Sequence, residues 1–399
     1  MAGLDEEVEV LVVGGGPAGT VLATLLASRG RSVAVFERGT PESLALGTGI
    51  LLQPNGLAVL YGLGLRDELH RVSVQHRAVP IEDERGRLIT TGEMPDFGHG
   101  LDHALALLRP TLQRILWSSL EARGGLVRFG CDVRAVDTAA GEVDVFAGGQ
   151  TYRISAEVIV GADGIGSVVR RSGAFGARPV AGAHHVIRTV VDGEFNVSGS
   201  EYWTGLGLFG ASPAGEGKTY AYASANDPEV LDAVRMRDLA RVVDLWSGAL
   251  PVAAPLLHQI RSVDDILLNE IGRVRCRRFA DRRAVLIGDA AHAMAPNLGQ
   301  GANSALVDAA VLARALTEAP TKLDALGRYD RQRRRPVRRV QRTSDLLAEV
   351  SHLRHTGLRR ARDRVFRIAG HPTLVRRQIR TTQQVDPAQL RRDVEALAG

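Results

Sequence analysis

A glycine-rich turn at residues 14–19 constrains the fold of this chain more than any other feature. The preceding residues 8–13, VEVLVV, form an apolar, β-branched run that is typical of a buried parallel strand. The residues that follow, TVLATLLASRG at 20–30, have the pattern of a helix that ends at Gly30. Strand, turn, helix and second strand within about 30 residues are specific for dinucleotide binding. The sequence therefore predicts a Rossmann-like α/β domain.

The glycines of the turn have the G-x-G-x-x-G spacing, at Gly14, Gly16 and Gly19. Gly14 permits a tight turn, Gly16 lets the backbone approach a pyrophosphate, and Gly19 lets the helix pack closely on the strand. The start of the helix adds N–H donors and the positive end of its dipole. The alternative is a glycine-rich connection that binds nothing. The other residues of the predicted pyrophosphate turn are Gly15, Pro17 and Ala18.

The second predicted strand, RSVAVFE, ends in Glu37, eighteen residues beyond Gly19. A carboxylate in this place accepts hydrogen bonds from the hydroxyls of an adenosine ribose and disfavours a 2′-phosphate. The first turn therefore predicts FAD or NAD rather than NADP, and it leaves the choice between FAD and NAD open.

Two later strands also end in acids. Residues 157–170, EVIVGADGIGSVVR, place Asp163 in a glycine turn after a buried strand, and residues 283–289, RAVLIGD, end in Asp289. Parallel strands deliver such residues to a ligand at their carboxyl ends. Acids here would suit the ribityl chain of FAD, which nicotinamide cofactors lack. The alternative is that both acids cap the helices that follow them, and for Asp163 both roles can hold together.

The composition indicates an ordinary globular protein, with 45% hydrophobic and 24% charged residues. No apolar run reaches the roughly 18 residues of a membrane span, and the acidic N-terminus lacks the pattern of a signal peptide. The two cysteines, Cys131 and Cys276, are far apart. We therefore expect a reduced, cytoplasmic protein without disulfides or a metal site.

Arginine supplies nearly all of the positive charge, since Lys218 and Lys322 are the only lysines. The net charge of +5 is modest, and much of the excess falls after residue 328. A surface for nucleic acid or an acidic membrane is one interpretation of this cluster. No nucleic-acid motif accompanies the arginines, so we favour the solvated face of C-terminal helices.

Three motifs together carry a family resemblance: GGGPAG with Glu37, GADGIGSVVR, and GDAAHAMAPNLGQGANSALVDA at 288–309. They resemble the class A, single-component FAD-dependent monooxygenases, the group of 4-hydroxybenzoate and salicylate hydroxylases and the tetracycline-inactivating monooxygenase. The resemblance covers residues 8–340 and includes GILLQPNGLAVLYGLGL at 49–65, LRPTLQRIL at 108–116 and the closing helices at 311–339. It departs from many relatives at 43–49, SLALGTG, which lacks an arginine.

The resemblance implies a non-covalently bound FAD and a role for each matching position. Residues 14–19 would hold the pyrophosphate, Glu37 the adenosine ribose, and Asp289 the ribityl chain, while His292 would be structural rather than a base. Backbone N–H groups at 299–303 would face the flavin N1–C2 carbonyl edge. The further implied contacts are Arg38 near the ribose, Arg109 near the ribityl phosphate, Val133 at the adenine, Asp163 and Gly288 in the site, Pro296 beside the isoalloxazine, and Gly299, Gln300, Gly301, Ala302 and Asn303 at the helix start.

The resemblance also implies the reaction. NAD(P)H would visit transiently and reduce the flavin, O2 would add at C4a, and the resulting hydroperoxide would hydroxylate an aromatic or polycyclic small molecule. The cofactor carries this chemistry, so no side chain is assigned a catalytic role. The expected partners are the aromatic substrate and O2, without nucleic acid, and the chain would be a monomer or a homodimer.

The predicted fold is a Rossmann-like (GR2-type) FAD-binding domain with an interleaved, mostly antiparallel substrate domain and C-terminal helices. The FAD-binding segments are 1–70, 106–177 and 281–330, the substrate segments are 71–105 and 178–280, and the helical segment is 331–399. Residues 199–224 alternate aromatic and small residues, as antiparallel strands do. Either sheet packing or a pocket for a flat substrate explains the aromatic residues of this region, which are Tyr202, Trp203, Phe209, Tyr220 and Tyr222.

Three alternatives share parts of this pattern. A flavin-dependent halogenase would need a W-x-W-x-I-P signature, which the chain lacks. An FAD-dependent reductase of an isoprenoid-like substrate would share the first and third motifs. A redox-inactive FAD-binding module would bind flavin without consuming NAD(P)H.

Overall fold

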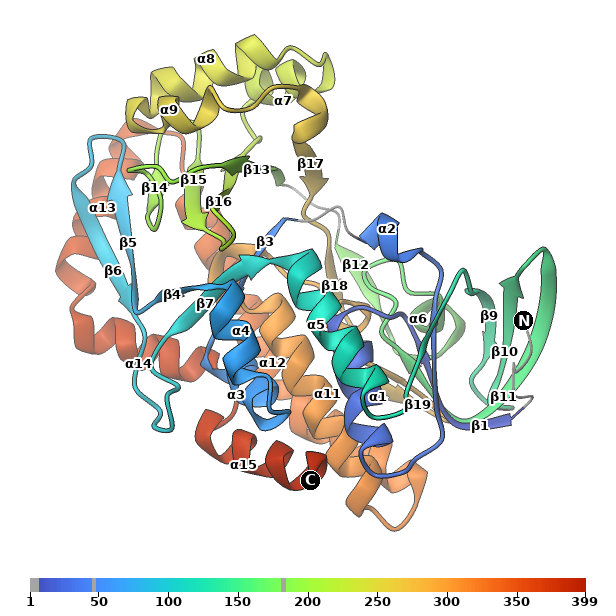
Figure 1. Cartoon of the computed structure of the whole chain (residues 1–399). Coiled ribbons are helices and arrows are strands. Elements are labelled where there is room, and N and C mark those ends of the chain that lie inside the picture. The colour runs from blue at the N-terminus through green and yellow to red at the C-terminus, as the bar shows by residue number, and fades with distance from the viewer. Residues whose placement is uncertain (1–6, 45–47, 181–183) are drawn as a thin grey trace.

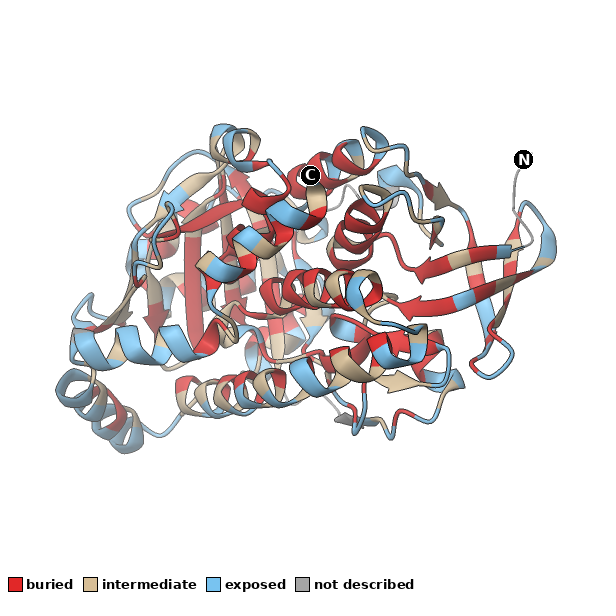
Figure 2. Cartoon of the chain, turned by 90° about the horizontal axis from the view of Figure 1, so that it is seen from below, coloured by how far each residue is buried: buried red, intermediate tan, exposed pale blue. Residues whose placement is uncertain are grey.

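The computed structural model describes residues 7–44, 48–180 and 184–399. Two large β-sheets lie on different sides of the molecule, and long helices pass between and around them (Figure 1). Buried residues fill the strands of these sheets, whereas helices at the outer surface alternate buried and exposed residues (Figure 2). The mixed α/β class predicted from the sequence is confirmed. Within the described residues, no helix is long and apolar enough to cross a bilayer.

The main sheet contains the predicted dinucleotide-binding strands. Its order is β19-β20-β11-β1-β2-β8, and two antiparallel strands extend it, because β10 pairs with β11 and β9 pairs with β10. The strands β1, β2, β8, β11 and β20 run parallel. Their apolar runs are buried because helices cover the sheet. The strands are β1 (Glu7–Val13), β2 (Val33–Glu37), β8 (Val127–Phe129), β9 (Asp132–Asp137), β10 (Glu142–Ala147), β11 (Gln150–Gly161), β19 (Ala280–Asp281) and β20 (Ala284–Leu286).

The second sheet is mostly antiparallel and has the order β17-β13-β16-β15-β14-β5-β6. Its one parallel pair joins β14 to β5. Residues of β13, β15 and β16 share a hydrophobic core with α7 and α8, which lie above the sheet in Figure 1. The strands are β5 (Ala78–Asp83), β6 (Leu88–Glu93), β13 (His185–Asp192), β14 (Glu201–Trp203), β15 (Leu208–Pro213), β16 (Lys218–Ser224) and β17 (Leu267–Glu270).

A small sheet, β3-β7-β4, lies between the two large ones (Figure 1). Strand β7 crosses the predicted boundary at residues 105 and 106, and the domain boundaries stay predictions. A further pair, β12 and β18, is antiparallel. These strands are β3 (Gly49–Leu52), β4 (Val74–His76), β7 (Ala104–Leu108), β12 (Arg178–Val180) and β18 (Arg273–Arg275).

Helices complete the layers. Helix α1 packs between α5 and α11, and α11 also packs on α3 and α12. The α-helices are α1 (Pro17–Ala27), α2 (Pro41–Leu44), α3 (Pro54–Gly62), α4 (Arg66–Val72), α5 (Arg109–Glu121), α6 (Val168–Ser172), α7 (Pro228–Arg235), α8 (Leu239–Ala249), α9 (Ala254–Leu257), α10 (Asp289–His292), α11 (Gly301–Glu318), α12 (Lys322–Ser351), α13 (Thr356–Ala369), α14 (Pro372–Thr382) and α15 (Pro387–Ala398). The short 3-10 helices are η1 (Pro251–Ala253), η2 (Val263–Asp265) and η3 (Pro296–Leu298).

The C-terminal helices dock on both halves of the molecule. Helices α13 and α14 contact β6, and α15 contacts α3. The last contact is close because Gly62 has no side chain: a Cβ there would lie 2.6 Å from Val394. The arginine-rich end of the chain therefore forms helices that pack on the rest of the molecule, and the interpretation of its arginines as a solvated face stays a prediction.

Candidate active site

Four strands of the main sheet end at the same level. In the ladder, Val13 of β1 lies opposite Phe36 of β2 and Gly161 of β11, and Gly161 lies opposite Leu286 of β20. The turns that follow these four strands therefore all lie at one edge of the sheet. This register brings the glycine turn and the three strand-end acids of the sequence analysis together at the carboxyl edge of the sheet.

The three glycines of the first turn differ in what they contact. Gly14 has φ +107°, and a Cβ there would lie 2.4 Å from the Ala162 carbonyl oxygen. A Cβ on Gly19 would lie 2.1 Å from the Gly14 oxygen. Gly16 has an ordinary φ of −71°, and a Cβ there would meet nothing within 4 Å. The fold itself thus requires Gly14 and Gly19, whereas Gly16 borders open space at the start of α1, as a pyrophosphate site requires.

Glu37 closes the first turn. Its carboxylate accepts hydrogen bonds from the N–H groups of Gly15 and Gly39, both at 2.8 Å. Each oxygen keeps a second lone pair for a ribose hydroxyl. Arg38 is exposed next to it. The Cys131 N–H donates to the Glu37 carbonyl, which brings the loop before Val133 to the same edge.

Two residues that the sequence analysis missed hold the turn from the other side. Gln113 Nε2 and Trp117 Nε1, both on α5, donate to the Gly15 carbonyl at 2.9 and 3.2 Å. Their spacing of four residues places them on one face of the helix, but only the pairing of α5 with α1 shows their target. Arg109, the first residue of α5, is exposed.

The two carboxylate oxygens of Asp163 differ in their hydrogen bonds. Oδ2 accepts from the N–H groups of Val168 and Val169 at 2.6 and 3.3 Å. Oδ1 is buried and has no hydrogen-bond partner among the described residues. Burial raises the pKa of this carboxyl, and its hydrogen bonds oppose the rise. A buried, unpartnered acceptor beside a turn at the strand ends is suited to a ligand donor.

Gly288 and Asp289 form the corresponding turn after β20. Gly288 has φ +58°, and its N–H donates to Asp308 at 2.9 Å. Asp289 opens α10 with an exposed side chain that makes no hydrogen bond or ion pair within the described ranges. Its carboxylate is therefore available to hydroxyl donors. Pro296 is exposed at the start of η3.

The start of α11 presents its backbone to the same region. Gln300 and Asn303 use their side chains internally: Gln300 contacts Gln53, while Asn303 accepts from the Gln53 N–H at 2.9 Å and donates to the Leu51 carbonyl at 2.9 Å. Gly299 has φ +62°. The first N–H groups of a helix have no intrahelical acceptor, and a Cβ on Gly301 would meet nothing within 4 Å. The backbone from 301 to 303, with Ala302 between, thus offers donors and a positive dipole end.

His292 belongs to a buried ionic cluster. Its Nε2 lies 2.5 Å from Asp308 Oδ2, and Arg333 Nε donates to Oδ1 at 2.6 Å. Burial alone would raise the pKa of Asp308, but the charges of His292 and Arg333 hold it below its usual value. The cluster joins α10, α11 and α12 beneath the site. His292 is buried against Asp308 and therefore joins these helices.

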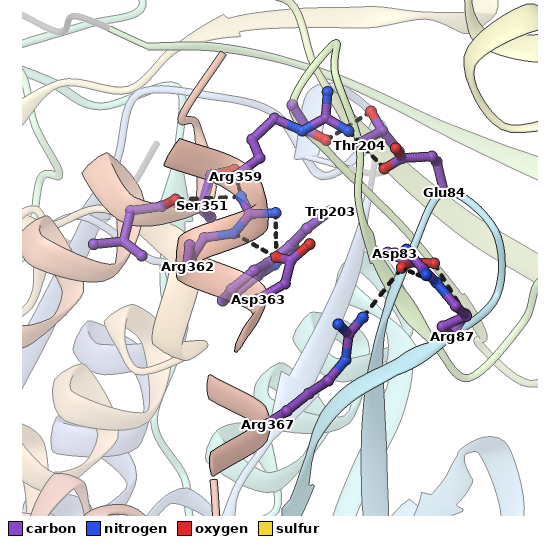
Figure 3. Close-up of polar contacts among 12 residues, drawn as sticks. Asp83, Glu84, Arg87, Trp203, Thr204, Ser351, Arg359, Arg362, Asp363 and Arg367 are labelled. Carbon is purple, nitrogen blue, oxygen red and sulfur yellow. Dashed lines mark hydrogen bonds and ion pairs between the residues drawn. The ribbon is translucent and has the colours of Figure 1, made fainter. Parts of the chain in front are cut away.

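The aromatic residues of 202–222 separate into two groups. Tyr220 and Tyr222 line a cavity of about 90 Å³ between the second sheet and the strands β3 and β7. Phe209 packs on Trp246 beneath α8. The remaining members, Tyr202 and Trp203, are buried in sheet packing. The Trp203 ring contacts Phe366, and the Arg362 guanidinium lies over it (Figure 3).

Taken together, the edge carries open space for a pyrophosphate at Gly16 and the start of α1, which we call the pyrophosphate cradle. It also carries strand-end acids with free acceptors and a helix start with free donors. This set of donors and acceptors fits FAD. The cofactor is long enough to reach both the turn at 14–19 and the turn at 288–303. The fold and the site define an FAD-binding flavoprotein.

Comparisons with known proteins agree. The family described as FAD binding domain matches residues 7–344. The chain is 32% identical to 3-amino-4-hydroxybenzoate 2-monooxygenase of Streptomyces cremeus, covering 93% of this chain and 94% of the relative. It is 33% identical to kynurenine 3-monooxygenase of Salinispora tropica, over 90% and 81%. The solved tetrameric 2-methyl-3-hydroxypyridine-5-carboxylic acid oxygenase is 27% identical with a TM-score of 0.74, over 89% of this chain and 94% of its own. The chain belongs to the family of FAD-dependent aromatic monooxygenases.

Proposed function

We propose that this protein is an NAD(P)H-consuming monooxygenase that hydroxylates an aromatic or polycyclic small molecule with one atom of O2. The observation that carries the proposal is the register of the main sheet, which brings the N-terminal turn and the turn before α11 to one edge. Bound there, FAD supplies the redox chemistry and the activation of O2. The protein supplies binding, electrostatics and exclusion of water.

The described residues divide these tasks along the cofactor. We assign the pyrophosphate to Gly16 and the start of α1, and the adenosine ribose to Glu37. We assign the ribityl chain to Asp289, with Asp163 as a second acceptor. N–H groups at the start of α11 would stabilise negative charge on the flavin ring, since preorganised donors act most strongly where water is excluded.

The cavity lies beside the residues that we assign to the flavin ring. Leu51 lines it, and the Leu51 Cδ2 atom is 4.0 Å from the position of a Cβ on Gly299. Tyr220 covers Gly49 so closely that a Cβ there would lie 2.4 Å from its ring. A substrate held between Leu51 and Tyr220 is thus next to the start of α11. The mostly apolar walls would keep water from the reacting atoms.

The alternatives find less support. The relatives compared above are named as monooxygenases or an oxygenase, so neither an isoprenoid-type reductase nor a redox-inactive module is favoured. The segment 43–49 includes residues 45–47, which lie outside the described residues, so the steering of NAD(P)H stays a prediction.

The test uses the purified holoprotein. FAD is released by denaturation and identified by chromatography, and NADH or NADPH oxidation is followed with and without phenols, quinolones and polycyclic aromatics. We expect substrate-stimulated oxidation and a product heavier by one oxygen. Bound FAD without stimulation by any ring would instead support the redox-inactive module.

A further inference from the structure

The polar groups that line the cavity beside α11 are uncharged. Among the described residues they are His76, Ser200, Ser212, Tyr220 and Tyr222, and the rest of the lining is apolar or glycine. The undescribed stretches 1–6, 45–47 and 181–183 contain no arginine or lysine in the sequence. The lining therefore has no guanidinium or ammonium group to pair with an anion.

His76 does not supply a cation either. Its Nε2 lies 3.1 Å from the Ser212 hydroxyl, and burial lowers the pKa of the imidazole below its usual value. At neutral pH the ring is therefore neutral and offers one donor and one acceptor.

Two arginines lie near Tyr220 but outside the lining. Burial raises the pKa of Tyr220, whereas the charges of Arg188 and Arg109 and a side-chain hydrogen bond with Arg188 oppose this rise without reversing it. Arg188 donates to Asn269 Oδ1 at 2.8 Å, so part of its guanidinium is already engaged. Arg109 is exposed at the start of α5. Neither residue is part of the cavity lining, and the guanidinium of Arg188 is engaged with Asn269 and Tyr220.

A carboxylate contacts Tyr222, whose ring neighbours that of Tyr220 on the same strand. Glu201 accepts from the Tyr222 hydroxyl at 3.2 Å and from Trp203 Nε1 at 2.7 Å. No cation pairs with it among the described residues, and burial raises its pKa to about 7. An anionic substrate beside Tyr222 would thus lie near a second acid.

We propose that this cavity takes a neutral aromatic ring with a hydroxyl or ring N–H group and no carboxylate, such as an aminophenol or a hydroxyquinoline. The inference rests on the proposed function and narrows its substrate class. Burying a carboxylate without a cationic partner costs several kcal/mol, whereas hydroxyl and N–H groups can be satisfied by the imidazole and hydroxyls of the wall. The expected substrate differs from the benzoate in the name of the Streptomyces cremeus relative.

Matched ligands test the inference on the holoenzyme. 3-Amino-4-hydroxybenzoate, its methyl ester and 2-aminophenol share one ring, and the ester keeps the size of the acid without its charge. Affinities at pH 8 are measured from the change in flavin absorbance. We expect the ester and the aminophenol to bind at least tenfold more tightly than the acid. An acid that binds as tightly as its ester, or no binding by any of the three, would overturn the inference.

A charge swap provides the second test. Ser212→Arg places a guanidinium on the cavity wall, and Ser212→Gln is the matched neutral control. We expect Ser212→Arg to reverse the preference toward the acid and Ser212→Gln to leave it unchanged, with FAD content confirming folding. An FAD-loaded Ser212→Arg enzyme that still rejects the acid would show that charge does not set the preference. Binding order is independent of turnover, so failure of NAD(P)H oxidation with correctly ordered affinities would refute the proposed function and leave this inference standing.

Discussion

At the scale of single residues, Gly16 is a position where a substitution should weaken cofactor binding without destabilising the fold. Its φ is ordinary, and a Cβ there meets only open space. We expect Gly16→Val to leave the melting temperature of the flavin-free protein unchanged and to weaken FAD binding at least tenfold, about 1.4 kcal/mol, because the new side chain occupies the pyrophosphate cradle. Flavin titration and thermal melts of the apoprotein measure the two effects.

Gly19 is the control for this prediction. A Cβ there would lie 2.1 Å from the Gly14 carbonyl, so Gly19→Val should lower the apoprotein melting temperature itself. Equal FAD affinity in Gly16→Val and the unmodified protein would contradict the assignment of the cradle.

The raised pKa of Glu201 predicts that the free energy of unfolding depends on pH. Its pKa rises from 4.5 to about 7 on folding. Between these values the folded chain holds a proton that the unfolded chain has released, so the free energy of unfolding falls as pH rises through this window. The loss is on the order of 3 kcal/mol. Glu201→Gln keeps the hydrogen-bonding shape and removes the titration, so the variant should gain stability relative to the unmodified protein from pH 5 to pH 8.

Thermal melts at both pH values measure this gain. Glu194→Gln, at an exposed glutamate, should follow the unmodified protein at both. Parallel curves for Glu201→Gln and the unmodified protein would argue against a buried, proton-holding Glu201.

The glycine roles could be predicted from the sequence because they depend on local backbone geometry. The internal use of Gln300 and Asn303 could not, because their partners Gln53 and Asn55 lie about 250 residues away in the chain. The five aromatic residues were similarly ambiguous. Alternation predicts strands, but the facing layer decides which side holds a core and which holds a cavity.

At the scale of elements, the ionic cluster of Asp308 fixes helix α11. Asp308 is fully buried between His292 and Arg333. Removing its charge leaves Arg333 buried without its partner, so Asp308→Asn should cost about 3–5 kcal/mol. Denaturant unfolding of the holoprotein measures this loss.

Glu318 on the same helix is the matched control. Its ion pair with Arg314 is solvent-exposed, so Glu318→Gln should change stability by less than about 1 kcal/mol. If Asp308→Asn lost no more than Glu318→Gln, the cluster would not anchor the helix.

The strands and helices of the FAD-binding half were predictable because each has a strong apolar period and a glycine boundary. The fold class, the family and the FAD cofactor are confirmed. The small sheet was not predicted, since β3, β4 and β7 are short and pair across distant segments. The burial of Asp308 could not be predicted either, because an acid within a helix is usually exposed. Only the structure shows that Arg333 of α12 pairs with it.

At the scale of the whole molecule, α13 clamps the far edge of the second sheet. Figure 3 shows Arg367 of this helix reaching Asp83, the last residue of β5, and Arg359 reaching Glu84, the next residue. The Asp83 side chain is almost fully buried and also accepts from Arg87. We expect Asp83→Ala to release α13 without loss of FAD, because none of these residues lies at the carboxyl edge of the main sheet.

Limited trypsin digestion measures the release. Cleavage within residues 352–371 should become several-fold faster in Asp83→Ala and stay unchanged in Asp264→Ala, which breaks an exposed ion pair elsewhere. Unchanged cleavage in Asp83→Ala would show that the other contacts of α13, such as Phe366 with Trp203 and Arg359 with Glu84, are enough to hold the helix.

The central claim is that one bound FAD, held by the turns at 14–19 and 288–303, lets this protein insert an oxygen atom from O2 into a neutral aromatic ring. The most direct test is turnover of 2-aminophenol or 4-hydroxyquinoline with NAD(P)H under 18O2, followed by mass spectrometry of the product. The account predicts a hydroxylated product that carries one 18O atom, with no label acquired from H218O under ordinary O2. A product labelled from water, or NAD(P)H consumption that yields only peroxide with every ring, would contradict it.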